Sequence, residues 1–212
     1  MINPRQVENA ASTVGAIVLA AGASTRMGTP KQLLDFQGRS FLRHTVEIVV
    51  ASICKPIVVV LGAYAEKIRP EVNHLPVLVV ENPQWQDGMG ASIQVGMTAL
   101  NAATEEIEGV VLTLCDQPFV SCDVINQLVA AYHSTGQGII ASEYAGTLGV
   151  PALFSRKFFS DLLNLQTTSG AKQVIKKYSH EVFPLPFAAG AIDVDTPQDY
   201  EELQTRRNSH PF

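Results

Sequence analysis

The chain has 212 residues, of which 46% are hydrophobic and 17% charged, and its formal net charge is −5 at pH 7. This composition excludes a disordered or fibrous protein, and the length favours one domain with a substantial core. The acidic balance argues against nucleic acid as the main partner, because nucleic acid binds basic surfaces. An anionic ligand must therefore be held by local groups.

The ends and the cysteines predict a cytoplasmic protein. No apolar stretch is long enough to span a bilayer and no signal peptide is recognisable, so we expect no membrane association. Cys54, Cys115 and Cys122 form no CxxC pair, which favours reduced thiols. The small and polar residues 1–13 predict a loose leader before a single domain over 14–206.

Short apolar runs alternate with helix-like segments, which is the pattern of an α/β fold with a mostly parallel sheet. The runs lack polar alternation, so we expect strands buried on both faces at 16–19, 57–61, 77–80, 110–114 and 138–141. Apolar spacing and capping residues predict helices over 40–52, after the glycines of 87–92, from Ser121 to about 133, and from Thr196 onward.

A loop of small residues, LAAGASTRMGTPK at 19–31, follows the first predicted strand. Five residues separate Gly22 from Gly28, and Lys31 comes three after Gly28, so the spacing is not that of a P-loop. The dinucleotide pattern GxGxxG is also absent. Small residues nevertheless let backbone N–H groups approach an anion, and Arg26 and Lys31 add positive charge. The loop predicts a phosphate site, with an ordinary connection between elements as the alternative.

The ordered set Leu19-Ala20-Ala21-Gly22-x-Ser24-x-Arg26-Met27-Gly28-x-x-Lys31 resembles the signature of sugar-nucleotide-type nucleotidyltransferases. Within them the chain is similar, over about 14–204, to the MobA-like NTP transferases, the branch that includes molybdenum cofactor cytidylyltransferase. The resemblance implies a Rossmann-like three-layer sandwich of the nucleotide-diphospho-sugar transferase type. It also implies transfer from an NTP to a phosphate-bearing acceptor with release of pyrophosphate. The nucleotide-binding residues that it implies are Leu19, Ala20, Ala21, Gly22, Ser24, Arg26, Gly28, Lys31, Gly88, Ser92 and Asp116.

One position bears on the base. The guanylyltransferase branch tends to carry two glycines where this chain has Ala21-Gly22. By that analogy Ala21 favours the smaller base, cytosine, and hence CTP.

Two acids match the metal-binding motifs of the same family. Asp116 lies in Leu114-Cys115-Asp116-Gln117-Pro118, at the carboxyl end of a predicted strand, where parallel sheets bind ligands. Asp195 lies near the C-terminus, with Asp193 as a neighbour. The resemblance implies that Asp116 and Asp195 hold Mg²⁺, which neutralises charge on reacting phosphates, and that Arg26 and Lys31 complete the catalytic set. For a lone Asp before a proline, turn formation is the alternative.

The acceptor side rests on less specific matches. Segment 82–92 is similar to the loop that leads into a helix near the nucleoside, and Trp85 either stacks on a ring or packs in the core. Segment 149–154 either lines the acceptor pocket or is a turn before a helix. The family usually has a Gly-Asp pair before a Gly-Ala-Arg triplet, whereas this chain has Thr167-Thr168-Ser169-Gly170-Ala171-Lys172. The acceptor-binding residues implied are Gln117, Pro118, Gly149, Pro151 and Lys172.

The sequence thus favours a magnesium-dependent cytidylyltransferase acting on molybdopterin, with a molybdoenzyme as a further partner that receives the product. A guanylyltransferase, or a cytidylyltransferase for another phosphorylated metabolite such as methylerythritol phosphate, is the alternative within the family. A nucleotide-binding chaperone with little turnover is the alternative from another class. A redox Rossmann protein is disfavoured because its fingerprint is missing.

Overall fold

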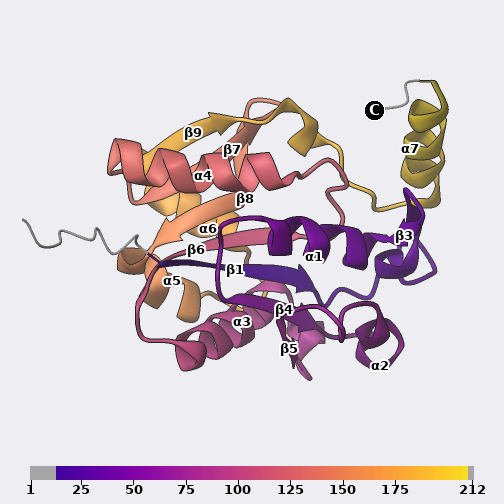
Figure 1. Cartoon of the computed structure of the whole chain (residues 1–212), viewed down its shortest axis with the longest axis horizontal. Helices are drawn as coiled ribbons and strands as arrows, with labels where there is room; N and C mark the ends of the chain where they lie inside the picture. The colour runs from indigo at the N-terminus through magenta and orange to yellow at the C-terminus, as the bar shows by residue number, and fades with distance from the viewer. Residues whose placement is uncertain (1–12, 210–212) are drawn as a thin grey trace, which may run out of the picture.

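Seven strands form one central sheet in the part of the chain that the computed structural model describes, residues 13–209 with side chains up to 205 (Figure 1). The spatial order is β5-β4-β1-β6-β8-β7-β9. The strands are β1 (Thr13–Ala20), β4 (Ile57–Leu61), β5 (Leu78–Glu81), β6 (Ile107–Leu114), β7 (Ile139–Tyr144), β8 (Thr147–Ser155) and β9 (Val182–Pro186). The predicted leader lies outside the described residues except for Thr13, which begins β1.

The sheet is mostly parallel, as the sequence predicts. Neighbours β5, β4, β1 and β6 pair in parallel, and so do β7 and β9. β8 pairs antiparallel with both β6 and β7, and it is the one reversed strand of this sheet within the described residues. The carboxyl ends of β1, β4, β5 and β6 therefore share one edge, and the start of β8 lies at that same edge.

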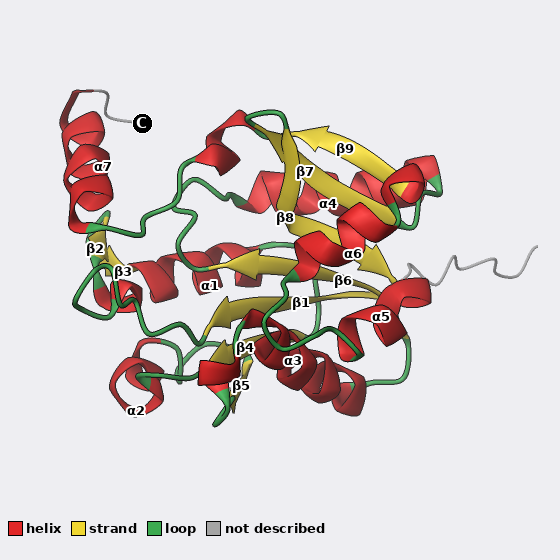
Figure 2. Cartoon of the chain, turned by 180° about the vertical axis from the view of Figure 1, so that it is seen from behind, coloured by secondary structure: helices red, strands yellow, loops and turns green. Residues whose placement is uncertain are grey.

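Helices cover both faces of the sheet and complete a three-layer sandwich. The side chains of β1 alternate, so that Val14, Ala16 and Val18 enter one core and Ile17 and Leu19 the other. The first core is closed by α1 (Phe41–Ala51), α2 (Ala65–Ile68) and α4 (Cys122–Thr135). On the opposite face, seen from behind in Figure 2, lie α3 (Met89–Ala103), α5 (Phe159–Leu163) and α6 (Ala171–Lys177).

The predicted strands all exist, but the prediction of two-sided burial is wrong for one of them. The run 57–61 is β4 and is buried throughout, whereas β5 is an edge strand whose Leu78 is 44% exposed. β5 is exposed because it lies at the edge of the sheet, where β4 is its one partner among the described residues. Segment 149–154, for which the sequence predicts an acceptor-pocket segment or a turn before a helix, belongs to the strand β8.

Capping residues start the helices where the sequence indicates. The hydroxyls of Ser40 and Ser121 accept from the backbone N–H groups of Arg43 and Val124. Thr196 and Asp199 form a reciprocal capping box at the start of the last helix, α7 (Pro197–Ser209). The helix expected after the glycines of 87–92 begins within them, at Met89.

A third, small core fixes the C-terminal part. Met27, Phe36 and Phe41 pack with Val194 and Leu203, and the Tyr200 hydroxyl donates to the Asp35 carbonyl at 2.9 Å. This holds α7 against the hairpin formed by β2 (Asp35–Phe36) and β3 (Arg39–Ser40), at one end of the molecule (Figure 1). None of the helices between residues 13 and 209 is long and apolar enough to cross a membrane.

Candidate active site

A cavity of about 470 Å³ lies at the edge of the sheet where the parallel strands end. It lies where the chain leaves β1 and β6, whose ends are in register at Leu19 and Leu114. The lining residues come from four segments that are remote in sequence, namely Leu19–Ala23 with Arg26, Lys31 and Gln32, then Trp85, Gln86, Gly88, Met89 and Ser92, then Leu114–Asp116, and finally Asp193 and Asp195.

A buried amide shapes the loop after β1. Gln32 is 1% exposed, and its Nε2 donates to the carbonyls of Ala20 at 3.0 Å and Gly22 at 2.8 Å. Its Oε1 accepts from the Ser24 hydroxyl, which in turn accepts from the backbone N–H of Lys31 at 3.1 Å. Gln32 cannot be recognised from the sequence, because a polar residue after the loop is indistinguishable from a surface residue until its burial is known.

The same contacts keep the loop available for an anion. Gln32 occupies the carbonyls of Ala20 and Gly22, whereas the N–H groups of Gly22 and Ala23 have no hydrogen-bond partner within residues 13–209. A Cβ added at Gly22 would meet no atom within 4 Å. The space next to this glycine is therefore not needed for packing within the protein.

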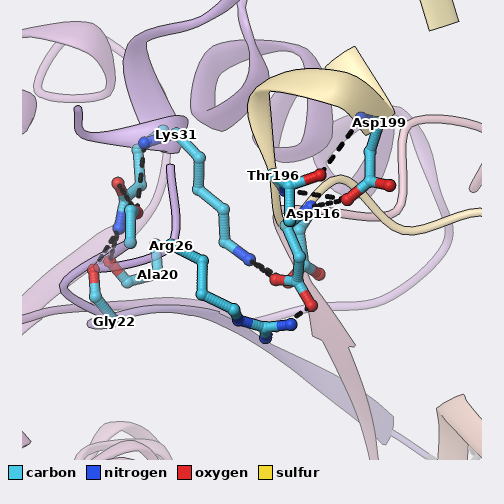
Figure 3. A network of polar contacts seen from close by, with 10 residues as sticks. Ala20, Gly22, Arg26, Lys31, Asp116, Thr196 and Asp199 are labelled. Atoms are coloured by element: carbon cyan, nitrogen blue, oxygen red, sulfur yellow. Dashed lines mark hydrogen bonds and ion pairs between the residues drawn. The ribbon is translucent and has the colours of Figure 1, made fainter. Parts of the chain in front are cut away.

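Two cations from the loop meet two carboxylates from distant segments (Figure 3). The Lys31 Nζ lies 2.6 Å from Asp116 Oδ2 and 2.8 Å from Asp195 Oδ1. Arg26 Nη2 lies 2.7 Å from Asp195 Oδ2. The four residues of the predicted catalytic set therefore form one network.

The C-terminal segment is tied directly to Asp116. The Val194 N–H donates to the Asp116 carbonyl at 3.0 Å, and Val194 is fully buried in the third core. On the other side of Asp195, the carboxylate of Asp199 accepts from the backbone N–H groups of Asp195 and Thr196. The helix cap that the sequence reveals thus also orients Asp195.

The charges at the site shift the protonation equilibria in opposite directions. Burial disfavours charge on Lys31, but the carboxylates of Asp116 and Asp195 outweigh it and raise the Lys31 pKa. Burial likewise opposes charge on Asp195, yet hydrogen bonds from Lys31 and the charges of Lys31 and Arg26 lower its pKa. At Asp193, burial together with the charges of Asp195 and Asp116 outweighs the charge of Lys31 and raises the pKa.

The glycine segment before α3 has a structural function as well as a place in the cavity. Gly88 has φ +119°, and an added Cβ would lie 2.6 Å from the Thr167 carbonyl. The Gly90 N–H donates to that carbonyl at 2.8 Å, and the Ser92 hydroxyl accepts from Asn82. The Gly90 N–H is therefore occupied within the protein and is not free for a ligand. Trp85 lines the cavity and also packs against the core.

The residues implied for the acceptor are dispersed, and none of the five lines the cavity. Gln117 is buried, and its Nε2 donates to the carbonyls of Val150 and Gly190. The Pro118 carbonyl faces a ring nitrogen of His44. Gly149 and Pro151 lie within β8, and the Tyr144 hydroxyl fills the space where a Cβ of residue 149 would lie. Lys172 is exposed on α6.

A sequence profile for the MobA-like NTP transferase domain matches residues 16–182. The chain belongs to this family. Its three-layer sandwich is that of nucleotide-diphospho-sugar transferases, and the protein is a MobA-like nucleotidyltransferase.

Three relatives illustrate the range of the family. Nicotine blue oxidoreductase of Paenarthrobacter nicotinovorans is 32% identical over 144 residues, 68% of this chain and 67% of the relative. Molybdenum cofactor cytidylyltransferase of Escherichia coli K12 is 23% identical over 196 residues, 92% of this chain and 97% of the relative. The crystal structure of Rv0371c from Mycobacterium tuberculosis H37Rv in complex with manganese has a TM-score of 0.73 and 29% identity, covering 91% of this chain and 98% of that one.

The acidic pair of this MobA-like site has the donor atoms that a hard divalent cation requires. The Oδ1 atom of Asp116 is buried and accepts no hydrogen bond from the described residues, so one carboxylate oxygen has no partner among them. The carboxylate of Asp195 lies nearby, because the Lys31 ammonium contacts both carboxylates. Two carboxylates, completed by phosphate oxygens and water, fit Mg²⁺ or Mn²⁺. No group of three or more acidic, histidine or cysteine ligands that could hold a metal ion occurs in the described residues.

Proposed function

We propose that this MobA-like nucleotidyltransferase transfers CMP from CTP to a phosphate-bearing acceptor, most favourably molybdopterin, and releases pyrophosphate. The observation that carries the proposal is the network of Arg26, Lys31, Asp116 and Asp195, which lines the cavity next to the loop after β1. This arrangement provides cations for a triphosphate and carboxylates for a metal, which are the two requirements of phosphoryl transfer chemistry.

The choice of CTP is supported by Ala21 and by the cytidylyltransferase of Escherichia coli, to which the chain is similar over 92% of its length. Ala21 lines the cavity, and its carbonyl accepts from the Ala63 N–H at 3.1 Å. Its Cβ lies against Gly62, where an added Cβ would approach it to 2.8 Å. The methyl group of Ala21 is thus held firmly, in the position where the guanylyltransferase branch has glycine.

In the proposed reaction an oxygen of the acceptor phosphate attacks the α-phosphorus in line, and the bond to pyrophosphate breaks on the opposite side. Asp116 and Asp195 would hold Mg²⁺, which supplies positive charge for the developing negative charge on phosphate oxygens. The N–H groups of Gly22 and Ala23 bind the triphosphate, and Arg26 and Lys31 neutralise the leaving group. A phosphate acceptor is already ionised at neutral pH, so the side chains need only position and stabilise charge.

Four alternatives to this activity are distinguished by experiment. The 32% identity with a protein named nicotine blue oxidoreductase favours, as a second candidate, a redox activity. The further alternatives are a guanylyltransferase, a cytidylyltransferase for another phosphorylated metabolite and a nucleotide-binding chaperone. Because the implied acceptor residues are dispersed, the structure constrains the acceptor less than the nucleotide.

The test is pyrophosphate release with Mg²⁺, comparing CTP, GTP, ATP and UTP, each with and without molybdopterin. Release from CTP that requires molybdopterin is expected. Release from GTP alone would replace the cytidylyl assignment, and nucleotide binding without release would favour the chaperone. NAD(P)H consumption is measured in parallel, and turnover there without pyrophosphate would favour the oxidoreductase.

We further propose that residues 14–206 act as one transferase domain in the cytoplasm and pass the product to a molybdoenzyme. Support comes from the two large cores, which contain residues from Val14 to Phe187 and from Ile17 to Ile175. The three cysteines are free thiols, which is typical of a reducing compartment. Limited proteolysis should leave a single fragment of about these bounds.

A further inference from the structure

Lys31 occupies an unusual position for a residue assigned to phosphate. Its ammonium lies between the two proposed metal ligands, 2.6 Å from Asp116 and 2.8 Å from Asp195 (Figure 3). We propose that Lys31 is a resident cation that occupies the metal position in the ligand-free protein, and that the triphosphate must draw it away before the metal binds tightly. This inference rests on the proposed function, because it uses the same metal and nucleotide sites.

The electrostatics of the ligand-free site support such an exchange. The Lys31 side chain is 14% exposed and Asp116 16%, so the attraction between them is screened less than at the surface. Arg26 neutralises the remaining oxygen of Asp195 at 2.7 Å. A divalent cation that entered this site would stand next to the Lys31 ammonium, and the repulsion would oppose binding.

The chain is built so that the ammonium can leave without disturbing the loop. The Lys31 backbone is fixed, since its N–H donates to the Ser24 hydroxyl at 3.1 Å, and the neighbouring Gln32 is buried. The side chain beyond it is a flexible four-carbon stem that carries a point charge. A bound triphosphate offers Lys31 several negative oxygens, and Asp116 and Asp195 then become free for the metal.

The exchange predicts that nucleotide and metal bind cooperatively, and that Lys31 opposes the metal when it is alone. The same residue would thus weaken metal binding before the nucleotide arrives and strengthen nucleotide binding afterwards. A lysine that acted on phosphate only would leave the affinity for metal alone unchanged. This difference separates the proposal from the role implied by the family signature.

The experiment titrates the protein with Mn²⁺ alone, without nucleotide, and follows unbound Mn²⁺ by electron paramagnetic resonance. We expect weak binding by the wild type and a Kd lower by about tenfold in Lys31→Gln, which removes the competing charge. Lys67→Gln is the matched control, because Lys67 is exposed on α2 away from the cavity. Equal or weaker Mn²⁺ binding by Lys31→Gln than by the wild type would overturn the proposal.

A second measurement covers the case in which Lys31→Gln folds poorly. Its unpaired carboxylates should lower the thermal midpoint, and Mn²⁺ should raise that midpoint more in the variant than in the wild type. Lys31→Met, which keeps the aliphatic stem, should behave alike, and an equal response to Mn²⁺ in all three proteins would contradict the exchange. Neither measurement uses CTP or molybdopterin, so failure of the proposed function and failure of the exchange remain distinguishable.

Discussion

The proposed nucleotide half and the proposed acceptor half of the site contrast in how their residues are assembled. On the nucleotide side, Arg26, Lys31, Asp116 and Asp195 meet in one network over the cavity. On the acceptor side, the implied residues are divided among a buried amide, a reversed strand and an exposed helix position.

The difference follows from the topology of the sheet. Loops that leave the carboxyl ends of parallel strands meet at one edge of the sheet. Residues of sequence motifs in such loops are therefore brought close together in the folded protein. The match at 149–154 lies instead within an antiparallel strand, whose residues alternate between two faces and pair on both sides. The residues of such a strand are constrained first by strand pairing and core packing, so a sequence match there is weaker evidence for ligand binding.

The largest effect should come from the nucleotide half. Asp116→Ala removes a carboxylate from the proposed metal site, and pyrophosphate release should fall on the order of 10²–10³-fold. Circular dichroism should show that the fold is kept. Asp123→Ala, in the exposed first turn of α4, is the matched control and should retain activity. Unaltered turnover in Asp116→Ala would exclude Asp116 as a metal ligand.

A pair of glycine variants compares two segments that line the cavity, the loop after β1 and the start of α3. Gly88→Ala should destabilise the protein by about 3 kcal/mol, because Gly88 has φ +119° and the new Cβ would meet the Thr167 carbonyl. Gly22→Ala should leave the thermal midpoint nearly unchanged but raise KM for CTP, since its Cβ enters open space beside the cavity. If both variants lost stability equally, the loop after β1 would be a packing element too.

A smaller effect is expected at the buried amide. Gln32→Met keeps the side-chain volume but leaves the carbonyls of Ala20 and Gly22 without a donor, which should cost about 2 kcal/mol. We also expect KM for CTP to rise more than kcat falls, because the loop loses its shape. Chemical denaturation and steady-state kinetics measure both, with Gln137→Ala at an exposed position as the control. A change in stability without a change in KM would make Gln32 a purely structural residue.

The smallest effect concerns Asp193. Its pKa is raised by burial and by the charges of Asp195 and Asp116, so ionised Asp193 opposes folding at neutral pH. Asp193→Asn should therefore stabilise the ligand-free protein at pH 7, by about 0.5 kcal/mol for a partly exposed charge. The gain should shrink as the pH falls through the raised pKa and vanish below the ordinary value of 3.8. Thermal unfolding between pH 3 and pH 8 measures this, and a gain that persisted at low pH would exclude the electrostatic cause.

Much of the fold could be predicted because its signals are local. The run of β-branched residues at 57–61 is a fully buried strand, and the caps at Ser40, Ser121 and Thr196 begin helices. These features depend on residues close in sequence, where backbone preference and hydrogen bonding decide the outcome. The order of small residues and cations after β1 indicates the family for the same reason, because the motif is contiguous in the sequence.

Other features were decided only by contacts between distant residues. The reversal of β8, the exposure of β5, and the burial of Gln32 depend on which strands and loops become neighbours. The pairing of Lys31 with Asp116 and Asp195 spans 85 and 164 residues, and no local pattern specifies it.

The sequence by itself therefore determined the strands β1, β4, β5, β6 and β7, the helix caps and the chemical groups of the proposed nucleotide site. The tertiary structure alone decided that Lys31 lies between both carboxylates and that the glycines at 88 and 90 hold a neighbouring loop. The physical reason is that local preferences act through adjacent backbone, whereas charge pairing and close packing act through space once the sheet has formed.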